Sequence, residues 1–140
     1  MRQTPDWVSE FVRACRVQEV LHRPESAEWL KTAEGMSLYG TIVHEAFLRA
    51  DGSVWFYIPV DRLKDPDRYE WQKAGELERL GAIKLGAKRY PRLLELLPSR
   101  PADTPDCTRC SGTGYVIANL QCPTCAGLGW VPSMGRLTSA

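Results

Sequence analysis

Four cysteines toward the C-terminal end of the 140-residue chain are the residues whose types and spacing best suit a defined chemistry. They form two Cys-x-x-Cys pairs, Cys107 with Cys110 and Cys122 with Cys125. Two thiolates three residues apart can grip one side of a metal ion, while nearby backbone N–H groups turn toward the sulfurs. Two such pairs complete the tetrahedral shell of zinc. The sequence therefore predicts one structural zinc ion, with no open position for a substrate.

The two pairs belong to an internal repeat in which residues 107–116 align with residues 122–131. Each copy reads Cys-x-x-Cys-x-Gly-x-Gly, followed by an aromatic residue and valine. The first glycine supplies backbone angles that a side chain would resist, and the second lets the strands pass close to the site. We expect the aromatic side chains to cover the ion. These positions are Gly112, Gly114 and Tyr115 in the first copy and Gly127, Gly129 and Trp130 in the second.

Redox chemistry and an iron–sulfur cluster are the alternative uses of these cysteines. A redox Cys-x-x-Cys pair needs a lowered thiol pKa, which commonly comes from a helix that begins just after the first cysteine. Here glycines follow instead, so structural metal is the preferred interpretation. The polar N-terminus lacks the apolar core of a secretory signal, which favours the cytoplasm and disfavours a disulfide framework.

The repeated unit resembles the zinc domain of DnaJ-type chaperones, in which two units bind each ion. The resemblance covers residues 107–131. That family's domain has four units and two ions, whereas this chain has two units and lacks the His-Pro-Asp tripeptide of a J domain. Small bacterial proteins of the anti-TRAP type use a single two-unit ribbon to build an interface with another protein. The resemblance thus implies a zinc-binding interaction or adaptor module, chaperone-like in type, without a J domain's activity.

The chain is expected to contain an N-terminal domain, a linker, a zinc ribbon and a tail. Residues 1–98 predict an α+β domain that folds without the ribbon, with helices packed on a small antiparallel sheet. Three prolines, Pro98, Pro101 and Pro105, mark a stiff linker that spans residues 99–106. The ribbon spans residues 107–132 and the tail residues 133–140. The ribbon buries little apolar surface alone, so zinc binding supplies its folding free energy, about 10 kcal/mol or more.

Apolar periodicity and turn residues predict the elements of the first domain. Helical spacing with Asp6 as cap predicts a first helix, and alternating apolar residues around Ala50-Asp51-Gly52-Ser53 predict a hairpin whose second strand is covered on both faces. The predicted elements are helices over residues 6–22, 24–35, 67–80 and 91–97 and a hairpin over residues 37–60.

The remaining candidates for chemistry favour structural interpretations. Cys15 lies on the apolar side of the first helix and is expected in the core. His22 and His44 stand without a ligand partner at metal-binding spacing. The aromatic residues Trp29, Trp55, Tyr57 and Trp71 are expected in the core, with a ligand-facing surface as the alternative. No catalytic triad or phosphate-binding loop can be assembled from the chain, so we expect no enzyme.

Charge gives a second hypothesis for function. The formal net charge is +1, but residues 84–100 carry Lys84, Lys88, Arg89, Arg92 and Arg100 against Glu95. This stretch, together with the ribbon, could form a nucleic-acid-binding surface. The ribbon itself is nearly neutral, and no apolar run is long enough to span a bilayer. We therefore expect a protein partner of unknown identity, with nucleic acid as the alternative and no membrane partner.

Overall fold

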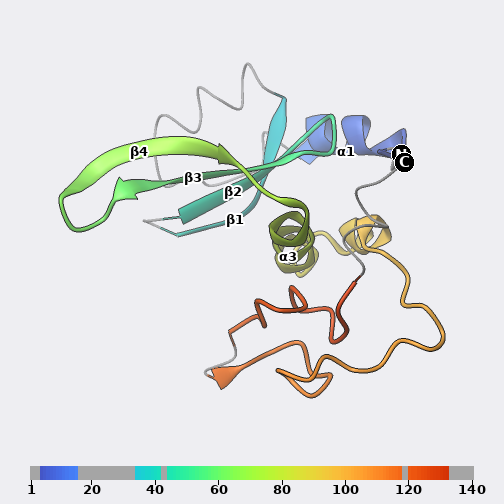
Figure 1. Ribbon diagram of the computed structural model, residues 1–140. Coiled ribbons are helices and arrows are strands. Elements are labelled where there is room, and N and C mark those ends of the chain that lie inside the picture. Colours follow the sequence, from blue (N-terminus) through green and yellow to red (C-terminus); the bar gives the residue numbers. More distant parts are fainter. Residues whose placement is uncertain (1–3, 16–33, 42–43, 118–119, 133–140) are drawn as a thin grey trace. The chain divides into compact units, whose positions relative to one another are not determined.

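The computed structural model describes residues 4–15, 34–41, 44–117 and 120–132 (Figure 1). The chain divides into two compact units, Gln3–Ala74 and Gly75–Ala140, the second of which includes Met1–Arg2. This division lies earlier than the expected domain end at residue 98. The helices after Ala74 therefore belong with the cysteine ribbon, and the independent folding of residues 1–98 stays a prediction. Within the described residues, no helix is long and apolar enough to cross a membrane.

The first unit opens with helix α1, Trp7–Cys15. Val8, Val12 and Cys15 recur at intervals of four and three and are all buried, which confirms the expected core position of Cys15. The helix packs against the first two strands of the sheet. The rest of the helix expected over residues 6–22, the second helix expected after Pro24, and the residues His22 and Trp29 lie outside the described residues.

A four-stranded antiparallel sheet follows in the order β1-β2-β3-β4. It confirms the α+β class and the hairpin expected within residues 37–60, which is the β2–β3 pair. Gly35, which was expected to end a second helix, is instead the first residue of β1. The strands are β1 Gly35–Thr41, β2 His44–Arg49, β3 Val54–Asp61 and β4 Asp65–Lys73.

Strand β4 corrects the helix expected over residues 67–80. Tyr69 and Trp71 are half-buried, while the other side chains of the strand are exposed. That alternation has the period of two that a strand face requires, and the helical interpretation missed it because two aromatic residues are a short signal. The helix begins only at Glu76, after the Ala74–Gly75 break.

Aromatic side chains hold β3 and β4 together on one face of the sheet. The ring centroid of Tyr57 lies 4.5 Å from that of Trp71 and 5.3 Å from that of Tyr69. Phe47 on β2 is fully buried and lies 5.4 Å from Trp71. These contacts favour the core interpretation of Tyr57 and Trp71. Trp55 is half-buried, and its indole N–H donates to Ser53 Oγ at 3.0 Å.

His44 begins β2 on the opposite sheet face from this aromatic group. Its ring packs edge-on against Phe56 at 5.1 Å, and its Nε2 lies 3.5 Å from Tyr39 Oη. These contacts give His44 a packing role within the sheet.

The β2–β3 turn places Gly52 in the left-handed region. Its φ is +88°, and its N–H donates to the Arg49 carbonyl at 2.9 Å. Asp51 orders the same turn, because its Oδ1 accepts hydrogen bonds from the Ser53 N–H and hydroxyl at 2.9 and 2.6 Å. Thr4 lies directly over the turn and donates its hydroxyl to the Asp51 carbonyl at 2.8 Å. A Cβ at Gly52 would collide with the Thr4 side chain.

The second unit begins with helix α3, Glu76–Gly86, followed by the 3-10 helix η2, Pro91–Leu96. The Gly75 N–H donates to the Glu78 carboxylate at 3.1 Å and so closes the first turn of α3. Helices α3 and η2 pack together, and Leu93 and Leu96 are the buried side chains of η2. This element occupies the position of the helix expected over residues 91–97.

The turn geometry yields a first prediction. Gly52→Ala should lower the free energy of unfolding by about 1–3 kcal/mol, because alanine resists a positive φ and meets Thr4. Urea denaturation followed by circular dichroism measures the change. Gly75→Ala is the control, because Gly75 has a φ of −68° and only an ordinary contact with Glu78 at 3.5 Å. Equal costs for the two variants would contradict the strain assigned to Gly52.

Candidate metal centre

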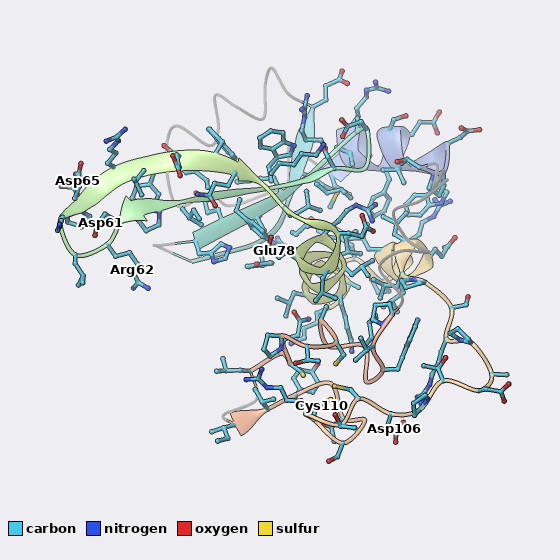
Figure 2. The ribbon with its side chains drawn as sticks, in the orientation of Figure 1. Asp61, Arg62, Asp65, Glu78, Asp106 and Cys110 are labelled. Atoms are coloured by element: carbon cyan, nitrogen blue, oxygen red, sulfur yellow. The ribbon has the colours of Figure 1, made fainter. Side chains whose placement is uncertain are left out.

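The four cysteine sulfurs converge on one point of the ribbon. The ligand atoms of Cys107, Cys110, Cys122 and Cys125 all lie within 4.8 Å of one another, and all four residues are buried. The Cys107 and Cys122 sulfurs are 3.9 Å apart, and those of Cys110 and Cys125 are 3.7 Å apart. Figure 2 labels Cys110 among the sulfur-bearing side chains of this group.

These distances fit a zinc ion. A tetrahedral site with zinc–sulfur bonds of about 2.3 Å places its sulfurs about 3.8 Å apart. The separations of 3.7 and 3.9 Å bracket that value, and the four thiols are the donor set that zinc prefers. The cluster can therefore hold a zinc ion with four protein ligands and no open coordination position.

Each Cys-x-x-Cys pair sits on the same kind of loop, which folds back on its own cysteines. The Gly112 N–H donates to the Cys107 carbonyl at 3.1 Å, and the Gly114 N–H donates to the Cys110 sulfur at 3.2 Å. In the second copy the corresponding bonds are Gly127 to Cys122 at 3.3 Å and Gly129 to the Cys125 sulfur at 3.3 Å. Backbone N–H groups directed at sulfur stabilise thiolates and lower the charge cost of four of them in one place.

The two copies are also joined to each other by reciprocal contacts. The Cys107 N–H donates to the Gly129 carbonyl at 2.8 Å, and the Cys122 N–H donates to the Gly114 carbonyl at 2.9 Å. All four repeat glycines have a φ between +80° and +88°. A Cβ at Gly114 would lie 2.5 Å from the Gly127 carbonyl oxygen, and one at Gly129 would lie 2.7 Å from that of Gly112. The expected roles of the glycines, positive φ and close approach, are both present.

The thiol pKa values reflect burial and hydrogen bonding. At Cys110 burial raises the pKa, but hydrogen bonds from the Gly114 N–H and from neighbouring thiols outweigh it and lower the pKa to about 6. At Cys125 burial prevails and raises the pKa to about 11. At Cys122 burial is again opposed by backbone hydrogen bonds, which lower the pKa. Because zinc binds thiolates, its binding displaces the protons that remain, and its affinity falls as the pH falls.

The aromatic positions of the repeat differ from their expected role as covers of the ion. The hydrophobic side chain packed against the four cysteines, among the described residues, is Val116. Trp130 is 7% exposed and belongs to the interior of the unit. Tyr115 is half-buried, and its ring centroid lies 5.7 Å from Lys84 Nζ on α3. The two copies therefore place their aromatic rings in different surroundings.

The ribbon docks on α3, a contact that the sequence did not predict. The Gln121 amide donates to the Gly81 carbonyl at 3.1 Å, and Lys84 Nζ donates to the Gly127 carbonyl. A Cβ at Gly81 would lie 2.8 Å from Gln121 Oε1 and 3.4 Å from the Ala126 Cβ. A glycine in the middle of a helix lowers helix stability, and its presence there often reflects close packing against another segment. Gly81 was therefore the one residue in the sequence that could have indicated this contact.

Arg100, near the start of the linker, makes hydrogen bonds to residues near the end of the linker. Its guanidinium donates to the Thr104 carbonyl at 2.8 Å and to Asp106 Oδ1, also at 2.8 Å. Asp106, labelled in Figure 2, lies beside the first cysteine loop, since a Cβ at Gly112 would be 2.7 Å from its carboxyl carbon. The expected proline linker at residues 99–106 is thus an ordered connection to the metal loop, while the expected tail at residues 133–140 lies outside the described residues.

Comparison of the chain with protein-family profiles, with curated proteins and with solved structures found no match. The metal centre therefore rests on its own geometry. The likeness to DnaJ-type zinc domains remains a likeness of the repeated motif.

The cluster predicts one zinc ion per chain. Elemental analysis of the protein purified under reducing conditions should give a zinc-to-protein ratio near one. Cys110→Ser and Cys125→Ser should each abolish bound zinc, because three sulfurs no longer complete the closed shell. The control is Cys15→Ser, which removes a buried thiol from the other unit and should retain the ion. An iron–sulfur absorption band in place of zinc would refute the assignment.

The α3 contact predicts a graded effect of volume at Gly81. Gly81→Leu should destabilise the ribbon by about 1–3 kcal/mol, because its side chain must displace Gln121 and Ala126. The rate at which a chelator removes zinc should rise accordingly. Gly81→Ala is the smaller step for comparison, because its added carbon meets Gln121 Oε1 at 2.8 Å and the Ala126 Cβ at 3.4 Å, and its cost should be smaller. Indistinguishable release rates for the two variants would mean that the ribbon does not rest on α3.

Proposed function

We propose that this protein is a non-enzymatic interaction or adaptor protein of the cytoplasm whose ribbon, residues 107–132, is built around one structural zinc ion. The observation that carries the proposal is the group of four buried sulfurs within 4.8 Å of one another. With four protein ligands the ion has no position for a substrate or an activated water, so its role is to hold the ribbon in shape. A reducing compartment keeps these thiols available for metal.

The surface of the ribbon supports a protein partner. Residues 110–135 contain no Asp, Glu, Lys or Arg, although a quarter of the whole chain is charged. Within this neutral stretch Ile117 is 89% exposed and Leu120 is 64% exposed. The backbones of the two residues are joined, because the Leu120 N–H donates to the Ile117 carbonyl at 3.4 Å. Exposed branched apolar side chains without nearby charge suit an apolar surface on another protein.

Ile117 and Leu120 suit this role better than Tyr115 and Trp130, the aromatic pair of the repeat. The burial of Trp130 and the position of Tyr115 beside Lys84 give both rings intramolecular roles. Interface energy tends to concentrate in a few side chains, so Ile117 and Leu120 are the positions to test first.

Nucleic-acid binding, the alternative, is less well supported because much of the basic stretch is engaged within the chain. Lys84 donates to Gly127, Arg92 pairs with Glu95 at 3.7 Å, and Arg100 pairs with Asp106. The other two cations of the stretch, Lys88 and Arg89, are exposed. Two cations beside a neutral ribbon form a small footprint for a polyanion, whose binding grows with the number of phosphates contacted.

The proposal predicts that the paired substitutions Ile117→Ser and Leu120→Ser abolish capture of the partner while zinc stays bound. Affinity purification from the source cell, with the wild type and this variant in parallel, should recover a protein set that is at least about tenfold depleted with the variant. Zinc content, measured on the same samples, should be unchanged.

The charge reversals Lys88→Glu and Arg89→Glu serve as the control and should leave that protein set in place. The opposite pattern would overturn the proposal. It would consist of capture that survives the apolar substitutions, together with binding to a labelled oligonucleotide that is lost on charge reversal and falls steeply between about 50 and 200 mM salt.

A further inference from the structure

Strand β4 is an edge strand of the sheet. Its sequence places residues of opposite charge at equal distances before and after Tyr69. Among the described residues β3 is its only sheet neighbour, and the strand runs from Asp65 to Lys73. Apart from the half-buried Tyr69 and Trp71, its side chains are exposed. An edge of this length presents N–H and C=O groups along one side, which another strand can pair with.

We infer that two copies of this chain join through β4, in antiparallel register about a two-fold axis at Tyr69. In that register Arg68 of each copy lies opposite Glu70 of the other copy. This opposite-charge pair occurs twice by symmetry. The two four-stranded sheets then form one continuous eight-stranded sheet.

The neighbouring registers are disfavoured by charge. Residues directly opposite each other in an antiparallel pair point to the same face, so a two-fold axis perpendicular to the sheet must pass through a residue opposite itself. Moving the axis by one residue centres it on Arg68 or on Glu70. Either shift sets two like charges directly opposite each other, which is destabilising. Tyr69 is therefore the centre that the sequence of β4 selects.

The aromatic face of the sheet continues across this junction. Tyr69 and Trp71 lie on the face that carries Tyr57 and Phe47. With the axis at Tyr69, the two Tyr69 rings meet at the centre of the dimer, and aromatic cross-strand pairs stabilise antiparallel sheets. The pairing thus covers the two side chains of β4 that already lie against the core.

Pro66 and an irregularity in β4 limit the ladder. Pro66 has no N–H to donate, and the β3–β4 pairing shifts register between Pro59 and Asp61. The backbone pairing with the second copy therefore stays within residues 67–71 and does not reach Asp65. The β3–β4 turn lies beyond this ladder, and Figure 2 shows Asp61, Arg62 and Asp65 at that far end of the hairpin. The turn is closed within its own chain, because Asp61 Oδ1 accepts from the Leu63 and Lys64 N–H groups, both at 3.0 Å.

Charge swaps at the exposed positions 68 and 70 test the inference. Sedimentation velocity over a range of concentrations should reveal a reversible dimer of the wild type. R68E sets two carboxylates opposite each other, and E70R sets two guanidinium groups opposite each other, so each should raise the dimer Kd by about tenfold or more. The double variant R68E/E70R restores both pairs and should return the Kd to within about threefold of the wild type.

Mixing the two single variants provides a second readout. Consider a heterodimer of one R68E chain and one E70R chain. One cross-strand pair joins the substituted Glu at position 68 to the substituted Arg at position 70, and the other joins the native Glu70 to the native Arg68. Both pairs therefore have opposite charges. An equimolar mixture should therefore dimerise where neither variant does alone. R62E is the matched control, because it makes the same charge change on the turn outside the ladder and should leave the Kd unchanged.

A wild-type protein that remains monomeric at about 1 mM would overturn the inference. So would a dimer that R68E and E70R leave intact, because it would use another surface. Circular dichroism of each variant confirms that the sheet is retained, which separates loss of pairing from loss of folding.

Discussion

The architecture of the ribbon depends on bringing four sulfurs to tetrahedral separation. Four thiolates at this spacing repel one another strongly, and only a shared cation makes the arrangement favourable. The surrounding backbone reduces that repulsion before any ion binds, because N–H groups from both loops are directed at sulfur. The chain therefore offers a partly organised cluster to a metal ion, and a bound ion would complete the fold of a segment that has little apolar surface of its own.

The same constraint extends to the helix beside the ribbon. Gln121 and Gly127 belong to the second cysteine loop, and both are held by groups on α3, the Gly81 carbonyl and the Lys84 ammonium. Movement of the loop would disturb these contacts together with the sulfur positions. Lys84 also places a positive charge near a cluster that carries net negative charge when its four thiolates hold one zinc ion. The helix and the metal centre are parts of one structure, which explains why the compact units divide before α3.

The cluster of four cysteines could be predicted from the sequence because its geometry is local. The spacing of Cys107 and Cys110, and its repetition 15 residues later, fixes each half of the site within a single loop. The docking of Gly81 against Gln121 could not be predicted in this way, since nothing in either segment identifies the other. Strand β4 was mistaken for helix for a related reason: Tyr69 and Trp71 alternate over too few residues, and their partners Tyr57 and Phe47 are distant in the chain. The β2–β3 hairpin was predicted correctly because its turn residues are adjacent and specific.

The reciprocal contact between the two copies of the repeat bears on how such a sequence can change over time. Gly114 lies against the carbonyl of Gly127, and Gly129 lies against that of Gly112. Each copy therefore limits the space for a side chain in the other. The residues between the cysteines tolerate difference, since Thr108-Arg109 in one copy and Pro123-Thr124 in the other all lie exposed on the outside of the loops. The glycines do not have this freedom. A side chain gained at a glycine of one copy would collide with the backbone of the other, so any change there would have to be accommodated by both copies at once.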